Sequence, residues 1–182
     1  MDLDQLLSVT KSDDYQPMVA GNFGLSRAYG YGEAVARDVG MERILDLHDL
    51  IVANGGRVHY VDYAKFLRFE KDGVFDNSIY VHKERDFDII LPSYAPLVEN
   101  RYTMAHELGH YVLHAKGKCY ARRNGTDLVE QEATCFALGF LMPSEMFKDA
   151  YLKCNKNVRE LSIAFLLPVE IVSSRVRSLN LS

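Results

Sequence analysis

The sequence has few cysteines, no long apolar run and no marked excess of charge. Its three cysteines, Cys119, Cys135 and Cys154, are odd in number and lack Cys-x-x-Cys spacing, which argues for free thiols in a reducing compartment and against a disulfide framework or a thiolate metal site. No apolar run approaches the roughly 18 residues of a membrane span, and no charged-then-apolar leader is present. We therefore expect a cytoplasmic protein without a membrane segment.

The net charge and the length narrow the class of protein further. A formal net charge of −4 provides no overall field that would attract nucleic acid or an anionic membrane. The 182 residues, 48% hydrophobic and 25% charged, are typical of a globular chain. We expect a single domain over residues 1–182 that buries roughly 70% of its unfolded surface. Residues 1–40 carry no recognisable motif and are interpreted as an N-terminal extension of unknown role.

The hydrophobic spacing predicts an α+β fold. Helical spacing extends over residues 25–39 and, more clearly, over residues 41–53, where Asn54-Gly55-Gly56 ends it. Alternating residues predict strands at 57–61, 78–83 and 87–91, and Glu84-Arg85-Asp86 joins the last two as a hairpin.

The most informative segment is His106-Glu107-Leu108-Gly109-His110. On a helix, residues four apart lie one above the other, so His106 and His110 can hold one ion, with Glu107 close to their face. Two neutral imidazoles that bind the metal and a carboxylate that takes a proton from water are what zinc-dependent hydrolysis needs. In a chain with six histidines and eleven glutamates, the pattern arises by chance roughly once in a hundred sequences.

A solvated helix face with the same residues would need no metal, but the surroundings favour a buried helix. Ala105, Leu108 and Val112 form an apolar stripe on another side of this helix. Gly109 costs up to about 1 kcal/mol in a helix interior, which indicates that another element approaches closely there.

A catalytic zinc site needs a third protein ligand and one open position. His114 is excluded as that ligand because its Cα lies about 12 Å along the helix axis from that of His106, so we expect it beside the site or in a structural role. Glu130 and Glu132 lie at the two edges of the apolar stripe of a second predicted helix, which Pro143 ends or restarts. The spacing alone does not choose between them.

Two motifs together resemble a known family. Residues 101–114 (Arg-Tyr-Thr-Met-Ala-His-Glu-Leu-Gly-His-Tyr-Val-Leu-His), followed by residues 132–137 (Glu-Ala-Thr-Cys-Phe-Ala) and by Leu141-Met142-Pro143, are similar to the ImmA/IrrE zinc metallopeptidases. Tyr102 stands where the family usually has Phe, and Thr134 where it often has Asn. The resemblance is strong over residues 97–143 and weaker over residues 41–92 and 158–179.

The resemblance implies one zinc ion per chain, held by His106, His110 and Glu132, with Glu107 as the catalytic base. The expected fold is a small mixed or antiparallel sheet packed on a helical zincin-like core with a C-terminal helix pair. The resemblance also implies a cytoplasmic peptidase that cleaves or inactivates a helix-turn-helix repressor in a phage, mobile-element, stress or toxin–antitoxin regulon. The alternative is a non-cleaving zinc-binding module that sequesters such a regulator.

The strand before the zinc helix is our candidate for substrate binding. An exposed edge strand can hydrogen-bond an extended peptide, and Ser78, Ile79, Tyr80 and Val81 resemble the family's strand at this position. An interior strand is the competing interpretation. Donors to the developing oxyanion could come from Tyr102, Tyr111, Tyr120 or His114, and we expect Tyr102 and His114 among the outer partners of the site.

The C-terminal segment, residues 158–179, predicts two short helices joined by a tight turn at Pro168. This pattern resembles a helix-turn-helix DNA reader. The segment holds Arg159, Arg175 and Arg177 against two glutamates, a net charge of +1, which is too little for a surface that follows phosphates. We therefore expect it to pack on the core. We also expect a helix-turn-helix regulator bound as a protein, with no direct contact to nucleic acid or membrane.

Overall fold

The computed structural model describes residues 24–40, 47–65, 79–115 and 128–181. Its fold is the α+β class that the sequence predicts, with a small mixed sheet and a mostly helical body. The elements are α2 (Leu25–Asp38), α3 (Leu47–Ala53), β1 (Gly56–Val61), β2 (Ile79–Lys83), β3 (Asp86–Pro92), α5 (Leu97–His114), α6 (Leu128–Leu141), α7 (Ser144–Lys153), α8 (Val158–Phe165) and α9 (Val169–Ser178).

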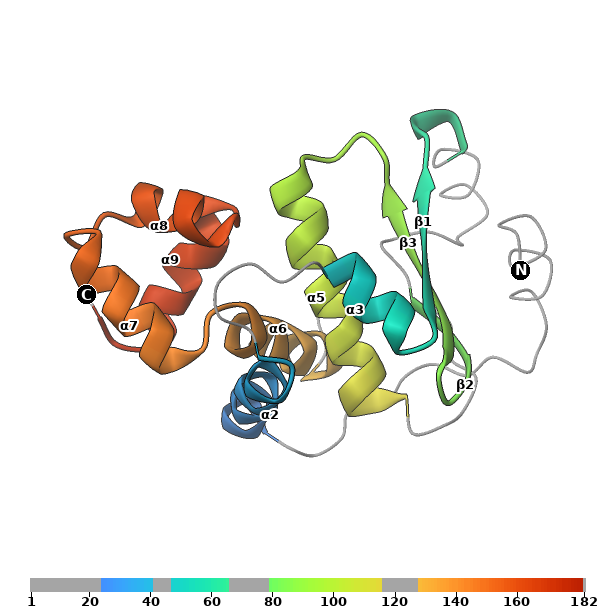
Figure 1. Cartoon of the computed structure of the whole chain (residues 1–182), viewed down its shortest axis with the longest axis horizontal. Coiled ribbons are helices and arrows are strands. Elements are labelled where there is room, and N and C mark those ends of the chain that lie inside the picture. The colour runs from blue at the N-terminus through green and yellow to red at the C-terminus, as the bar shows by residue number, and fades with distance from the viewer. Residues whose placement is uncertain (1–23, 41–46, 66–78, 116–127, 182) are drawn as a thin grey trace.

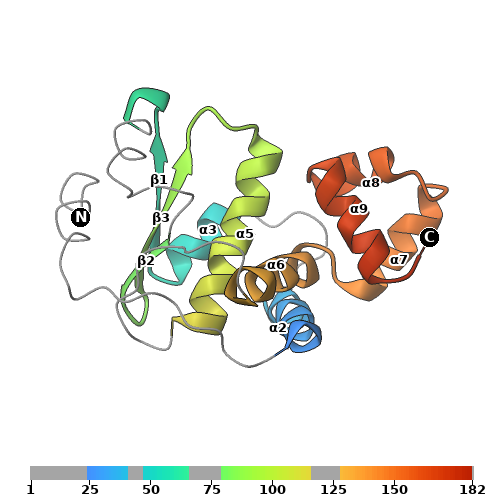
Figure 2. The ribbon, with the colours of Figure 1, turned by 180° about the vertical axis from the view of Figure 1, so that it is seen from behind.

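The elements follow one another along the long axis of the molecule. The sheet lies at one end, α3 and α5 lie beside it, α6 and α2 come next, and α7, α8 and α9 form the other end (Figure 1). The view from behind shows the same order, with α6 and α2 between α5 and the C-terminal helices (Figure 2). Helix α5 therefore has the sheet on one side and α6 on the other.

The sheet has the strand order β1-β3-β2. Strand β3 pairs in parallel with β1 and antiparallel with β2, so the predicted hairpin between the second and third strands is confirmed. Phe87, Ile89 and Leu91 alternate along β3 and pack into a buried cluster that includes Ile51 of α3. Because side chains alternate across a strand, Asp88 lies on the opposite face.

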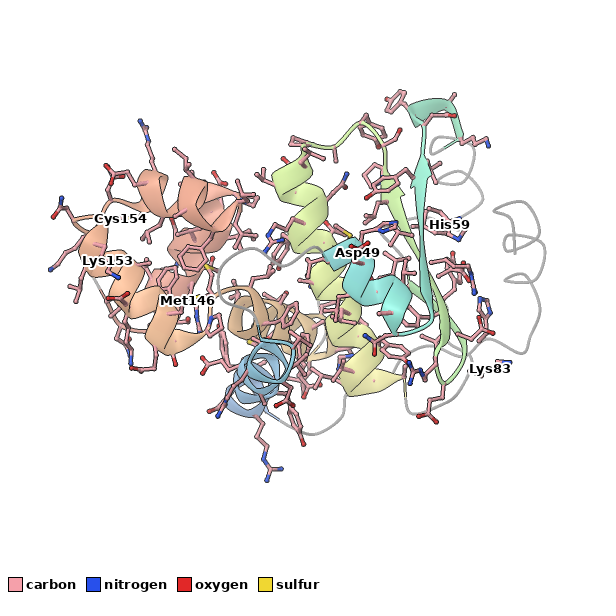
Figure 3. The ribbon with its side chains drawn as sticks, in the orientation of Figure 1. Asp49, His59, Lys83, Met146, Lys153 and Cys154 are labelled. Carbon is pink, nitrogen blue, oxygen red and sulfur yellow. The ribbon has the colours of Figure 1, made fainter. Side chains whose placement is uncertain are left out.

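A polar network on that opposite face joins the three strands. The Asp88 carboxylate accepts hydrogen bonds from Arg57 of β1 at 2.8 and 2.7 Å, and it lies 2.6 Å from Nε2 of His82 of β2. His59 of β1 contacts the other carboxylate oxygen and projects from the side of the sheet that faces away from α5 (Figure 3). Burial alone would raise the pKa of Asp88, but the bonds from His59, His82 and Arg57 outweigh it and hold this pKa well below its ordinary value.

Helix α2 packs so closely on α6 that their backbones touch. A Cβ at Gly32 would overlap the Phe136 carbonyl, and a Cβ at Gly139 would overlap the Tyr29 carbonyl. Ala28 and Ala36 of α2 are buried in the same contact. Residues 25–38 of the segment interpreted as an extension therefore form a helix that packs on the core. Residues 1–23 lie outside the described residues.

The C-terminal helices connect to this core through a buried arginine. Arg175 of α9 is 2% exposed, donates from Nε to the Met142 carbonyl at 2.9 Å, and forms an ion pair with Glu33 of α2. The two predicted helices over residues 158–179 are present as α8 and α9, whereas α7 was not predicted. With Arg175 paired in the interior, the exposed charges of this segment are Arg159, Arg177, Glu160 and Glu170, which cancel.

Three smaller expectations concern the second helix, the thiols and the membrane. The helix expected over residues 41–53 is described from Leu47 to Ala53, and residues 41–46 lie outside the described residues. Cys135 and Cys154 are free thiols, whereas Cys119 is not among the described residues. Among the described helices, none combines the length and apolar character needed to cross a bilayer.

We predict that Gly32→Ala lowers the free energy of unfolding by about 1–3 kcal/mol, because the added methyl group forces the backbones of α2 and α6 apart. Gly30→Ala is the matched control in the same helix, since nothing lies within 4 Å of its Cβ position. This control should gain up to about 1 kcal/mol from helix propensity alone. Urea unfolding followed by circular dichroism measures both changes, and equal effects of the two substitutions would contradict the close crossing.

We predict that Asp88→Asn destabilises the protein by about 3–5 kcal/mol near neutral pH, because it removes the buried anion that Arg57 and the two histidines bind. Since folding lowers the pKa of Asp88, its contribution is complete above its unfolded pKa of about 4 and is lost as the pH falls below that value. The stability difference from wild type should therefore shrink in acid. Asp86→Asn, which changes a partly exposed partner of Arg57, should cost about 1 kcal/mol or less.

Candidate metal centre

The site is formed where α5 packs against α6. The position that a Cβ of Gly109 would take lies 3.0 Å from the Ala133 carbonyl oxygen and 3.1 Å from Cδ1 of Phe136. The close approach that the sequence predicts at Gly109 is therefore confirmed, and the approaching element is α6. Any larger side chain at this position would push the two helices apart, together with the groups that they carry.

Most of α5 is buried, although its apolar stripe differs from the predicted one. Ala105 and Leu108 are buried as expected, but Val112 is 42% exposed, so its place in the stripe was wrong. The side of α5 that faces the sheet carries Met104 and Tyr111, which pack against the cluster around β3. The sheet and α6 together leave little of this helix in contact with water.

Three donor atoms converge between the two helices. Nε2 of His106 lies 3.1 Å from Nε2 of His110 and 3.1 Å from Oε2 of Glu130, and Nε2 of His110 lies 3.4 Å from Oε1 of Glu130. Among the described residues, these three make the one group of His, Cys, Asp or Glu side chains able to hold a metal ion. Bonds of about 2.0–2.1 Å in a tetrahedral site would separate ligand atoms by roughly 3.3 Å, so the spacing fits zinc.

Burial differs among the three donors. The side chains of His106 and His110 are 8% and 3% exposed, whereas that of Glu130 is 22% exposed. Solvent therefore reaches the group from the Glu130 side. Glu107, on the same turn of α5 as His106, is 1% exposed. A carboxylate that is so buried beside two imidazoles is a suitable proton acceptor for water held at this position.

The structure brings Glu130 to the histidine pair, whereas the ligand set that the resemblance implies has Glu132. Oε2 of Glu132 lies 3.1 Å from Nε2 of His114, and both side chains are fully buried. Two residues along a helix correspond to about 200° of rotation, so the two glutamates of α6 point in different directions. The packing of α6 on α5 decides which of them meets His106.

His114 lies behind His110 rather than in the donor group. Nδ1 of His114 is 3.2 Å from Nδ1 of His110, the ring nitrogen that points away from the donors. Burial lowers the pKa of His114 below its ordinary value, and the hydrogen bond to Glu132 offsets this only in part. His114 is therefore an outer partner of His110.

His106 has an outer partner that the sequence reasoning missed. Oγ1 of Thr134 lies 3.4 Å from Nδ1 of His106 and 3.5 Å from the Tyr102 hydroxyl. A spacing signal was present, because Thr134 and Glu130 are four residues apart and so share one face of α6. The expected place of Tyr102 near the site agrees with this contact.

One comparison with known proteins identifies the family. Residues 66–177 match the family model of the M78 peptidases, described as the IrrE N-terminal-like domain. The match covers more than half of the 182 residues and includes both helices of the site. The chain belongs to the M78 peptidase family. A comparison with curated proteins found no match.

The remaining candidates of this M78 peptidase lie elsewhere. Tyr111 stacks on Phe87 with 4.1 Å between the ring centroids, and its hydroxyl accepts a hydrogen bond from the Arg85 amide, so it faces the sheet. Tyr120 and Ser78 lie outside the described residues. Ile79, Tyr80 and Val81 belong to β2, which occupies one edge of the described sheet.

Proposed function

We propose that this M78 peptidase is zinc-dependent, with His106, His110 and Glu130 as the metal ligands and Glu107 as the general base. The observation that carries the proposal is the tetrahedral spacing of the three donor atoms, which come from two helices. A catalytic site also requires one open position for water, and Glu130, at 22% exposed, is the side chain of this group that solvent reaches most easily.

The metal ligands and Glu107 would have different roles in peptide hydrolysis. When bound, zinc supplies a Lewis acid that polarises the peptide carbonyl and makes water more acidic. The Glu107 carboxylate takes a proton from the attacking water and delivers it to the leaving amine nitrogen. Because Glu107 is buried, water does not compete for its charge and the proton transfer has a fixed geometry.

We infer that an extended peptide binds along β2. In the described part of the sheet, β2 pairs with β3 on one side and has no strand on its other side. An added strand would bond to the backbone of Ile79, Tyr80 and Val81 and so bring a carbonyl toward α5, which packs on the same sheet. Such binding requires a flexible segment of the substrate rather than a folded element.

The proposed substrate is a helix-turn-helix transcription regulator, which is recognised as a protein. Its support is family membership together with charge, because a chain of net charge −4 suits a basic DNA-binding protein. The exposed charges of α8 and α9 balance, which leaves these helices without the cationic surface that phosphate contacts need. A flexible linker of the regulator is the expected cleavage site.

We predict that wild-type protein holds one zinc ion per chain and that His106→Ala and Glu130→Gln lose it. Their loss of affinity should exceed the 10–100-fold that removal of an outer partner causes. Glu132→Gln should still bind zinc, with lower affinity. Metal analysis after dialysis, followed by chelator competition, measures these differences. If Glu132→Gln lost zinc and Glu130→Gln kept it, the ligand assignment would be wrong.

We predict that Glu107→Gln keeps the fold and the zinc but lowers kcat by about 10²–10⁴-fold, because the amide matches the carboxylate in shape and cannot accept a proton. Glu99→Gln, an exposed glutamate on the same helix, is the matched control and should retain wild-type activity. Cleavage by Glu107→Gln at the wild-type rate would remove the base from the mechanism.

We predict that co-expression with the regulator encoded beside this gene gives a zinc-dependent fragment of that regulator, detectable by mass spectrometry. The Glu107→Gln variant should leave the regulator intact while still binding it, which separates recognition from cleavage. A stable complex without cleavage by wild type would instead support sequestration. Binding to duplex DNA with a steep salt dependence, and no interaction with the regulator, would refute both versions.

A further inference from the structure

A buried histidine–carboxylate pair lies directly behind the proposed metal centre. His114 is in the last turn of α5, Glu132 is in α6, and Nε2 of His114 lies 3.1 Å from Oε2 of Glu132. Both side chains are fully buried. A buried carboxylate is costly unless it is paired, and a pair of apolar residues would join two helices at least as well. A polar pair at this position therefore calls for a more specific role than packing.

The other end of the pair reaches a proposed zinc ligand. Nδ1 of His114 lies 3.2 Å from Nδ1 of His110, whose Nε2 lies 3.1 Å from Nε2 of His106. A continuous line of contacts therefore runs from Glu132 through His114 to His110 and ends at the donor group. In both His114 and His110, one ring nitrogen contacts the preceding group of the line and the other ring nitrogen contacts the next group.

The order of donors and acceptors along this line determines where the protons lie. A carboxylate can only accept, so His114 donates from Nε2 to Glu132. In a neutral imidazole the lone pair of His114 is then on Nδ1, where it accepts the Nδ1–H of His110. The lone pair of His110 is consequently on Nε2, the atom that faces His106 and Glu130, and only an unprotonated nitrogen can bind a metal ion.

We propose that His114 and Glu132 are positioning residues. They hold His110 in the Nδ1–H form, so that the lone pair on its Nε2 points toward the other two proposed metal ligands, His106 and Glu130. The proposal rests on the proposed function of His110 as a ligand. It concerns His110, whose Nδ1 faces His114; Nδ1 of His106 instead contacts the hydroxyl of Thr134, which can either donate or accept. A carboxylate behind the bridging imidazole also makes Nε2 of His110 a stronger base toward a cation.

Two substitutions separate this role from simple packing. In Glu132→Gln the amide can donate to His114, which reverses the line of hydrogen bonds and places a proton on Nε2 of His110. Zinc affinity should then fall by about 10–100-fold. His114→Leu removes the nitrogen that accepts the hydrogen bond of His110, and it should also lower the zinc affinity. His114→Gln offers both a carbonyl oxygen for His110 and an amide for Glu132, so it should recover part of the affinity that His114→Leu loses.

A matched control is available in the sheet. His82 and Asp88 form a second, largely buried histidine–carboxylate pair, on the face of the sheet that lies away from α5. His82→Gln disturbs this pair in a similar chemical way and should reduce stability. Its zinc affinity should remain within about 3-fold of wild type, because it has no connection to His110.

The experiment combines zinc competition with a chelator and nitrogen-15 NMR of the imidazole rings in metal-free protein. We expect His110 of wild type to carry its proton on Nδ1 without zinc, and Glu132→Gln to move it at least partly to Nε2. A wild-type His110 protonated on Nε2, or unchanged zinc affinity and ring signals in Glu132→Gln, would overturn the proposal. Loss of zinc from Glu132→Gln as complete as from Glu130→Gln would also overturn it, since Glu132 would then be a ligand. Failure of wild type to bind zinc would refute the proposed function, while the ring signals would still decide the role of the pair.

Discussion

The close packing of α5 on α6 at Gly109 is the constraint on which the site depends. The backbone of Ala133 lies against the space that a side chain at Gly109 would fill, and this contact sets both the separation and the rotation of the helices. Two histidines from one helix and one glutamate from the other reach a common point because of it. Metal ligands need placement to within about half an ångström, and packed helices provide that accuracy better than loops do.

The elements around this helix pair complete its environment. The sheet covers the opposite side of α5 through Tyr111 and the cluster around Phe87, so α5 is held from both sides. Helix α2 supports α6 through contacts between the two backbones, and α9 is attached through Arg175. The polar side chains of α5 and α6 form two layers around the proposed metal position. His106, His110 and Glu130 form the donor group, whereas His114 and Glu132 lie one layer behind.

The sequence predicted what short-range spacing encodes. The motif at residues 106–110, the strands and helices α8 and α9 were found because local periodicity determines which residues share a face. The choice between Glu130 and Glu132 depends on the rotation of α6 against α5, which spacing within α6 does not contain, and the resemblance pointed to the other residue. Helix α7 was missed because Pro143 was treated mainly as an end, although it directly precedes this helix. The network of Asp88 joins residues about thirty positions apart in sequence, and no local pattern marks it.

The central claim is that His106, His110 and Glu130 form one zinc site. Anomalous diffraction from a crystal of zinc-loaded protein, measured on both sides of the zinc absorption edge, tests it most directly. We expect a single anomalous peak per chain, about 2.0–2.2 Å from Nε2 of each histidine and from a carboxylate oxygen of Glu130. A peak bound to Glu132 in place of Glu130, or a peak away from both histidines, would contradict the account.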